Sequence, residues 1–336
     1  MTTKTGILLI NLGTPDNCDV PSVRRYLNEF LNDPYVIDLP YLVRQILLKL
    51  VILPTRPKQS AHAYQKIWTK EGSPLLIHSQ ALENQLRTQL DCSFKIALGM
   101  RYGSPTIKGA MEQLKDVEQL IVLPLYPQYS TAATESSLQA VRKVHQSWQP
   151  SERPELKMID YFYDAEEFIT AQAKLIDNHL DKNSDFLLFS YHGLPERQLI
   201  KQGCQPICRD TCPPSNPNNP RCYRMQSFHT TSLISQKLGL KPEQYTTSFQ
   251  SRLGKTPWIV PYTDHTLTDL RKKGVENLAV VCPSFVADCL ETLEEIGIQA
   301  KEQWIEAGGK QFKLIPCLNA EQFWVDGLSK FILNQL

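Results

Sequence analysis

The stretch Phe186-Leu-Leu-Phe-Ser-Tyr191, followed directly by His192 and Gly193, says most about the fold. Apart from its serine the run is apolar, without polar alternation, which is typical of a parallel strand buried on both faces. Gly193 lets the chain turn sharply where this strand ends. His192 is therefore predicted to lie at the carboxyl end of a central strand, where open parallel sheets bind their ligands.

Similar short apolar runs recur along the chain, with helix-length periodic segments between them. This alternation predicts an α/β protein with parallel sheets and helices on both faces. So many strands favour two Rossmann-like lobes with a cleft between them, although no sequence repeat is visible. The expected strands are 7–11, 95–98, 120–123, 157–160, 186–191, 278–282 and 312–316, and the expected helices are 130–145, 165–180, 267–273 and 321–334.

The composition is that of an ordinary globular enzyme. The chain has 336 residues, 42% of them hydrophobic and 21% charged, with a net charge of +1. A nearly neutral chain has no general attraction for nucleic acid, so nucleic acid is not an expected partner. The apolar run near the N-terminus is too short for a signal peptide, and no stretch of about 18 residues is free of charge. We therefore expect a cytoplasmic enzyme without a membrane span.

A second predicted strand, 278–282, is followed by a segment with three carboxylates. Asp288, Glu291 and Glu295 are spaced i, i+3, i+7, so an α-helix would place them on one stripe. Such a stripe suits a hydrated divalent cation, whereas the alternative is that the helix dipole alone favours acidic residues there. His192 has alternatives too, since a neutral imidazole can bind a metal, accept a proton or simply bond to a nearby carbonyl.

The segments around these residues resemble the ferrochelatase family. Residues 190–195 (Ser-Tyr-His-Gly-Leu-Pro) and 285–293 (Phe-Val-Ala-Asp-Cys-Leu-Glu-Thr-Leu) carry the resemblance. It implies an enzyme that inserts Fe2+ into protoporphyrin IX in the last step of haem synthesis. Further matching segments follow in the family's order from about residue 5 to 330, namely 6–15, 66–69, 72–75, 100–102, 125–130, 250–252 and 257–258.

The resemblance also implies a domain organisation. It predicts an N-terminal lobe at 1–162 with an apolar lip near 36–54. A C-terminal lobe follows at 163–319, and a helix within 320–336 packs back against the first lobe. The porphyrin would lie between the lobes of what is expected to be a monomer.

The resemblance implies roles for the candidate residues as well. His192 and Glu291 align with the family's catalytic pair in the cleft and would contact the Fe2+ substrate, while Asp288 and Glu295 would form a relay. Cys289 stands where many relatives carry a histidine, so imidazole chemistry is not available at that position. Gln299 replaces a further acid, and the relay therefore ends one carboxylate early.

The chemistry of metal insertion predicts further contacts. Two pyrrole protons must leave, and the rigid ring must be distorted at a strain on the order of 1–5 kcal/mol. The porphyrin faces need apolar walls, and the propionates need cations or hydroxyl donors. The wall candidates are Leu12, Tyr102, Tyr126, Trp258 and Phe285, and the propionate candidates are Arg101, Ser130 and Thr131.

A segment rich in Pro, Asn and Cys at 203–222 is predicted to be a long inserted loop. Clustered cysteines in a cytosolic chain suggest metal ligation rather than disulfides, and the spacing is not that of a zinc ribbon. It resembles an insertion in some bacterial ferrochelatases that carry a [2Fe–2S] cluster, with zinc or unligated thiols as the alternatives. The four candidate ligands are Cys204, Cys208, Cys212 and Cys222, and the other five cysteines are expected to be buried hydrophobes.

Residues 40–53 are apolar except for Arg44, Gln45 and Lys49. One interpretation is a core helix with a polar stripe, and the other is a lip that touches the bilayer. Peripheral contact with the inner face of the cell membrane is therefore an expectation. For the activity, the alternatives are a chelatase for coproporphyrin or cobalt, or a non-catalytic two-lobed protein that binds a tetrapyrrole or a metal.

Overall fold

A computed structural model describes residues 5–181, 184–209, 212–213, 219–252, 254 and 256–336. The chain divides into two compact units. Unit 1 comprises residues 1–126, 130–161 and 319–336, and unit 2 comprises residues 127–129 and 162–318. The predicted domains 1–162, 163–319 and 320–336, and the predicted cleft between the lobes, stay predictions.

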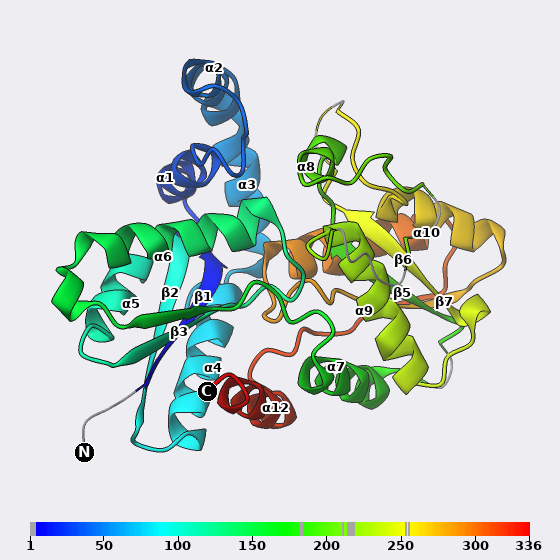
Figure 1. The fold of residues 1–336 in the computed structure, drawn as a ribbon. Helices are drawn as coiled ribbons and strands as arrows, with labels where there is room; N and C mark the ends of the chain where they lie inside the picture. The colour runs from blue at the N-terminus through cyan, green and yellow to red at the C-terminus, as the bar shows by residue number, and fades with distance from the viewer. Residues whose placement is uncertain (1–4, 182–183, 210–211, 214–218, 253, 255) are drawn as a thin grey trace. The chain divides into compact units, whose positions relative to one another are not determined.

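Unit 1 is built on a four-stranded parallel sheet in the order β2-β1-β3-β4. Leu8 and Ile10 of β1 face a buried core that α5 and α6 complete, and α4 contacts β1 and β2. The C-terminal helix α12 packs beside α4 (Figure 1). The elements are β1 (Thr5–Gly13), α1 (Val20–Leu31), α2 (Tyr41–Ile46), η1 (Leu47–Ile52), α3 (Leu53–Ile67), α4 (Pro74–Gln89), β2 (Phe94–Tyr102), α5 (Ile107–Gln113), β3 (Gln119–Pro124), η2 (Thr131–Glu135), α6 (Ser136–Ser147), η3 (Pro150–Glu152), β4 (Glu155–Met158) and α12 (Gln322–Leu333).

Unit 2 repeats this topology, because its parallel sheet has the order β6-β5-β7-β8. Leu188 and Val280 face a core completed by α10, η5 and α11, and α9 contacts β6. The elements are α7 (Glu166–His179), β5 (Phe186–His192), α8 (Glu196–Lys201), α9 (Tyr223–Lys237), η4 (Pro242–Gln244), β6 (Tyr245–Gln250), α10 (Thr263–Lys272), β7 (Asn277–Val281), η5 (Glu291–Ala300), α11 (Lys301–Glu306) and β8 (Gln311–Leu314).

The strand order creates one topological switch point in each sheet. In unit 2, β5 connects onward to β6 on one side, whereas β7 connects to β8 on the other. A crevice opens at such a point beyond the carboxyl ends of the strands, because the two connections diverge. β5 ends at His192, and the segment after β7 leads to Glu291, so the switch point is where these residues lie.

The predicted α/β fold with parallel sheets is confirmed, and each of the seven predicted strands overlaps a strand of the structure. The sequence did not predict β6, because its polar residues interrupt the apolar run by which the other strands were identified. Thr247, Ser248 and Gln250 are at most 4% exposed and satisfy their side chains by hydrogen bonds to α9, α10 and β5. The expectation that the five scattered cysteines are buried is wrong for exposed Cys92 and half-buried Cys18.

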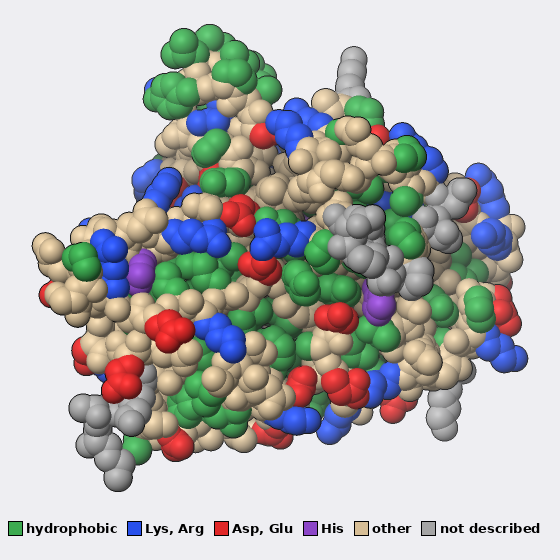
Figure 2. Space-filling view, viewed as in Figure 1, with side chains coloured by type: hydrophobic (Ala, Val, Ile, Leu, Met, Phe, Trp, Pro, Cys, Tyr) green, Lys and Arg blue, Asp and Glu red, His purple; other side chains and the backbone are tan. Residues whose placement is uncertain are grey.

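The predicted lip forms α2, η1 and the start of α3, and its apolar side chains point outward. Figure 2 shows hydrophobic side chains gathered over α2. Arg44 turns inward, is 7% exposed and donates to the carbonyls of Ile37 and Leu39, so it does not interrupt the apolar face. The face consists of Tyr41, Leu42, Val43, Ile46, Leu50 and Val51, which are 49–72% exposed. Among the helices that the structure describes, none is both long and apolar enough to span a membrane.

Candidate functional site

The backbone of His192 is held on both sides. Its N–H donates to Oγ of Ser284 over 3.2 Å, and its carbonyl accepts from the Tyr223 hydroxyl over 2.8 Å. The imidazole Nδ1 lies 2.7 Å from the carbonyl of Gly193. Because a carbonyl can only accept, Nδ1 carries the proton and Nε2 keeps its lone pair in the neutral ring. The bond to a nearby carbonyl is therefore compatible with the functional interpretations, since it leaves Nε2 available.

Gly193 is required by close approach at the end of β5. A Cβ at this position would lie 2.7 Å from the carbonyl oxygen of Gln250 and 3.2 Å from the ring of Trp258. The Gly193 N–H also donates to that same Gln250 carbonyl over 2.8 Å. The turn after His192 is thus fixed by packing and by hydrogen bonding.

The predicted α-helical stripe of three carboxylates is wrong. Residues 283–289 are irregular and the helix begins only at Leu290, so Asp288 precedes it. The Asp288 carboxylate instead accepts from the backbone N–H of Cys317 over 3.3 Å and from the Thr292 hydroxyl over 3.0 Å, which holds this segment as a loop. Glu291 and Glu295 belong to η5, a π-helix, a rare element that is frequently found at functional sites.

Glu295 is a carboxylate of this site whose pKa is raised, with burial as the largest cause. Its Oε2 accepts from the Ser251 hydroxyl over 2.5 Å and from Nε2 of Gln250 over 3.5 Å. Burial and the neighbouring Glu291 raise its pKa, while Ser251 and His192 lower it. Both His192 and Glu291 therefore lie within electrostatic range of Glu295, and the structure brings these three predicted residues together at the switch point of unit 2.

Sequence reasoning missed Gln250 as a connector in this site. Its Nε2 donates to the backbone carbonyl of Glu291 over 2.7 Å, and its Oε1 accepts from the Ser190 hydroxyl over 2.7 Å. Gln250 thereby joins β5 and β6 to the first turn of η5. The matching segment 250–252 was the only signal in the sequence that pointed to this residue and to Ser251.

The two wall candidates of unit 2 flank His192. The ring of Phe285 lies 6.3 Å from the imidazole, centroid to centroid, at an angle of 68°, and packs against the core beneath η5. Trp258 forms an isolated antiparallel β-bridge with Pro195, and next to it the Ile259 N–H donates to the carbonyl of Leu194. Both half-buried rings thus adjoin the turn that follows His192.

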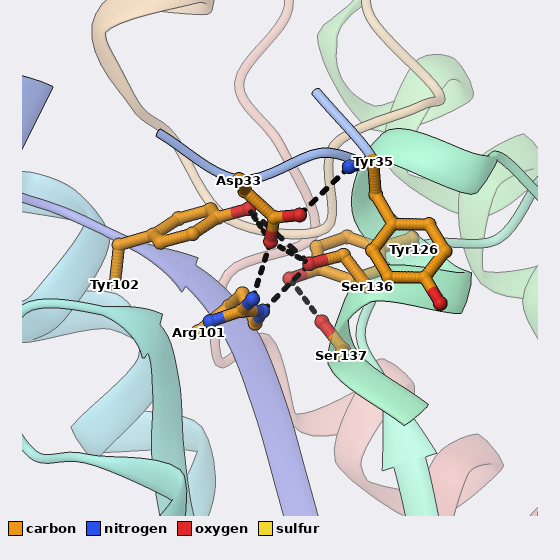
Figure 3. A network of polar contacts seen from close by, with 7 residues as sticks. All are labelled: Asp33, Tyr35, Arg101, Tyr102, Tyr126, Ser136 and Ser137. Atoms are coloured by element: carbon orange, nitrogen blue, oxygen red, sulfur yellow. Dashed lines mark hydrogen bonds and ion pairs between the residues drawn. The ribbon is translucent and has the colours of Figure 1, made fainter. Parts of the chain in front are cut away.

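In unit 1, Arg101 belongs to a polar network centred on Asp33 (Figure 3). Asp33, with a side chain only 3% exposed, accepts from the guanidinium of Arg101, from the Tyr102 hydroxyl over 2.8 Å and from the Ser136 hydroxyl over 2.6 Å. The Tyr35 N–H donates to its other oxygen over 2.8 Å. The guanidinium also lies 4.5 Å from the ring centre of Tyr102. The network fixes Arg101 beside a cavity of about 580 Å³ lined mainly by α6 and by residues 32–35, which follow α1.

The other candidates of unit 1 occupy different environments. Tyr102 is 1% exposed, so it supports Arg101 and offers no free face to a ligand. Ser130 is also buried, and its Oγ accepts from the Ala133 N–H at the start of η2. Leu12 and Thr131 are half-buried. Tyr126 is half-buried too, and its hydroxyl lies 3.4 Å from that of Ser137.

The predicted four-cysteine loop lies partly outside the described residues, at 210–211 and 214–218. Burial raises the pKa of both Cys204 and Cys212 to about 11. Neighbouring thiols add to this effect, namely Cys222 and Cys208 for Cys204, and Cys208 for Cys212. The four thiols therefore lie near one another.

A buried guanidinium contacts one of these thiols. Arg224 is 1% exposed and donates to Sγ of Cys212 over 2.9 Å and to the carbonyls of Val260 and Arg209 over 3.1 Å. This cation favours the thiolate form of Cys212. Across the described part of the chain, no three His, Cys, Asp or Glu side chains already form a group that could hold a metal.

Solved structures show where this fold occurs. The sirohydrochlorin chelatase SirB from Bacillus subtilis subspecies spizizenii, in complex with cobalt, matches with a TM-score of 0.56 and 10% identity, over 99% of this chain and 95% of that chain. SirB from Bacillus subtilis with Fe3+ also matches with a TM-score of 0.56, at 9% identity over the same shares. At such low identity, the likeness shows a shared fold.

Sequence comparisons are more specific. A ferrochelatase of Legionella pneumophila (strain Paris) is 51% identical over 333 residues, which cover 99% of this chain and 100% of the relative. A ferrochelatase of Coxiella burnetii (strain CbuG_Q212) is 52% identical over 339 residues, covering 99% and 94%. The family model described as Ferrochelatase matches residues 4–336. The chain therefore belongs to the ferrochelatase family.

Proposed function

We infer that this protein is a ferrochelatase that inserts Fe2+ into protoporphyrin IX and releases two protons to give protohaem. Family membership over nearly the whole chain supports the reaction. The observation that carries the chemistry is the imidazole of His192, whose Nδ1–H is bonded to Gly193 while Glu291 and Glu295 lie at the same switch point. A basic nitrogen beside carboxylates is what proton removal and cation delivery both require.

We assign His192 and Glu291 to the catalytic step and to contact with the Fe2+ substrate. The Nε2 lone pair can accept a pyrrole proton or bind Fe2+, and both acts need the same tautomer. Glu295, whose pKa is raised by burial, is suited to hold a proton and pass it on. Because the Asp288 carboxylate is hydrogen-bonded to Cys317 and Thr292, we assign it to holding the loop before η5.

We assign the porphyrin contacts unit by unit. In unit 2, Phe285 and Trp258 adjoin His192 and supply aromatic surface. In unit 1, Arg101 is the propionate partner, with Tyr102 and Asp33 holding its guanidinium. The remaining proposed contacts in unit 1 are Leu12, Tyr126, Ser130 and Thr131.

The decisive experiment is anaerobic incubation of the purified protein with Fe2+ and protoporphyrin IX, following loss of the free-base absorption spectrum. Parallel reactions with coproporphyrin and with Co2+ test the alternative substrates. We expect fastest conversion with Fe2+ and protoporphyrin IX. Faster conversion of coproporphyrin or cobalt would reassign the substrate. Porphyrin binding without conversion in any pairing would show a non-catalytic binding protein.

We also propose that Cys204, Cys208, Cys212 and Cys222 bind a [2Fe–2S] cluster, which needs four thiolates. The mutual electrostatic influence of the four thiols supports this fit, and so does the Arg224 guanidinium on Cys212, since it offsets the negative charge of bound thiolates. When bound, the cluster would supply iron–thiolate bonds that order a loop with little apolar content of its own. Zinc is the alternative metal for the same thiols.

We propose further that the protein is a cytoplasmic monomer that touches the inner face of the cell membrane through the lip. Six exposed apolar side chains on α2 and η1 would insert among lipid acyl chains. Residues 39–70 contain no acidic residue, while Lys49, Arg56 and Lys58 are exposed beside this face. This charge distribution complements anionic lipid headgroups.

A further inference from the structure

The three successive peptide groups between Tyr191 and Leu194 are each held by hydrogen bonds. The Ser284 hydroxyl accepts from the His192 N–H, and the Tyr223 hydroxyl donates to the His192 carbonyl. The Gly193 N–H donates to the Gln250 carbonyl, and the Gly193 carbonyl accepts from Nδ1 of His192.

We propose that Tyr223 and Ser284 are positioning residues that fix His192 in its Nδ1–H tautomer and so present Nε2 as an acceptor. The kinetic part of this proposal rests on the proposed function of His192. Neither hydroxyl is assigned a contact with the substrate. Their effect would pass through the peptide groups on either side of His192, because Ser284 bonds the N–H of one and Tyr223 bonds the carbonyl of the other.

The geometry explains how a hydroxyl on α9 can select a tautomer. The Gly193 carbonyl accepts from Nδ1 only while the preceding peptide keeps its orientation. Tyr223, 4% exposed, holds the carbonyl side of that peptide, and Gln250 holds its N–H side. Without the Tyr223 hydroxyl, a buried carbonyl would lose its donor, and the peptide would turn toward another partner. The Gly193 carbonyl would then move away from Nδ1, and the Nε2–H tautomer would become populated.

Tyr191 provides a matched control for Tyr223. Its hydroxyl is also buried and hydrogen-bonded, to Thr231 over 2.9 Å, and it precedes His192 by one residue. Tyr191→Phe therefore removes a similar bond near the same strand end without touching the His192 peptide. Ser284→Thr is the conservative counterpart of Ser284→Ala, because it keeps the hydroxyl.

The experiment uses the full-length protein labelled with 15N-histidine, without substrate. Long-range 1H–15N spectra report which ring nitrogen carries the proton, and His192→Ala identifies the signal. We expect the Nδ1–H tautomer for His192 in the parent, in Tyr191→Phe and in Ser284→Thr, and a mixture of tautomers in Tyr223→Phe and Ser284→Ala. In the insertion assay those two variants should lose kcat by on the order of tenfold, with an unchanged KM for porphyrin. Thermal unfolding midpoints verify that each variant is folded.

An unchanged tautomer in both Tyr223→Phe and Ser284→Ala, with a kcat no lower than that of Tyr191→Phe, would overturn the proposal. Full activity of His192→Ala would overturn the proposed function of His192 instead. The two failures are distinguishable because the tautomer is measured without substrate or turnover.

Discussion

The hydroxyl of Ser251 donates to Oε2 of Glu295 over 2.5 Å, and Ser251 adopts a φ of +67° at this position. A left-handed conformation costs a non-glycine residue on the order of 1 kcal/mol. The fold thus tolerates local strain that aims a hydroxyl at a half-buried carboxylate, as functional sites often do.

Glu295→Gln should stabilise the protein at neutral and alkaline pH while lowering insertion activity. Burial raises the pKa of Glu295 above its ordinary value near 4.5. The stability gained from its protonated form is fully present below pH 4.5 and is lost as pH rises through the raised folded pKa. The variant does not ionise, so its advantage over the parent in unfolding free energy should grow as the pH rises from 5 to 8. Urea unfolding at both pH values measures this.

The control for that series is Glu302→Gln, which changes an exposed glutamate of α11. Its effect should stay within about 0.5 kcal/mol at both pH values. A Glu295→Gln variant that tracks this control at both values would contradict the raised pKa.

Asp33→Asn should destabilise unit 1 by about 3 kcal/mol, because it leaves the Arg101 guanidinium without its buried counter-charge. Propionate binding should weaken as well, measured as a higher KM for porphyrin. Asp116→Asn serves as the control, since its ion pair with Lys95 is exposed and contributes at most about 1 kcal/mol. Equal destabilisation by the two variants would show that the network around Asp33 adds nothing.

His192→Ala and Glu291→Gln should each depress turnover by about 10²-fold or more, as expected for loss of an acid–base group. Glu291→Gln keeps the side-chain shape and removes the charge, so porphyrin binding, followed by fluorescence quenching, should persist. If binding were lost while turnover per bound porphyrin stayed normal, Glu291 would belong to the substrate wall.

With the proposed cluster bound, parent protein purified anaerobically should be red-brown. Cys208→Ser should remove this colour and loosen the loop, because a [2Fe–2S] cluster needs all four thiolates. Cys92→Ser changes an exposed cysteine outside the loop and should keep the colour. Iron, sulfide and zinc analysis, with limited proteolysis of the loop, provides the measurement. Colourless, fully active parent protein holding zinc or no metal would refute the cluster.

Leu42→Glu combined with Leu50→Glu should abolish sedimentation with phosphatidylglycerol-containing vesicles. Both leucines are 72% exposed on the lip, and a charge there opposes insertion. Ile305→Glu changes an apolar side chain that is 46% exposed on α11, outside the lip, and should sediment like the parent. Loss of vesicle binding in Ile305→Glu alone would locate membrane contact elsewhere.

The alternation of apolar runs was enough to predict the parallel sheets, because buried strands need no polar side chains. β6 was not predicted, because Thr247, Ser248 and Gln250 are polar but lie buried, with their side chains hydrogen-bonded to α9, α10 and β5. The prediction for Asp288 at the site was wrong for the same reason. Spacing suggested a continuous α-helix through Asp288, but tertiary bonds to Cys317 and Thr292 keep that residue in a loop. Hydrogen bonds between distant residues leave no periodic signal in the sequence.

The return of α12 to unit 1 has a consequence for synthesis on the ribosome. Residues 319–336 complete the unit that also holds the N-terminus, and Trp324, Val325, Leu328 and Ile332 of α12 are at most 1% exposed there. Unit 2 is therefore fully synthesised before unit 1 has all of its core. Until α12 emerges from the ribosome, the surface of α4 that it covers stays exposed. A chain that stalls or ends before α12 would therefore expose part of unit 1 to chaperones and proteases, although α4 and the missing helix are far apart in the sequence.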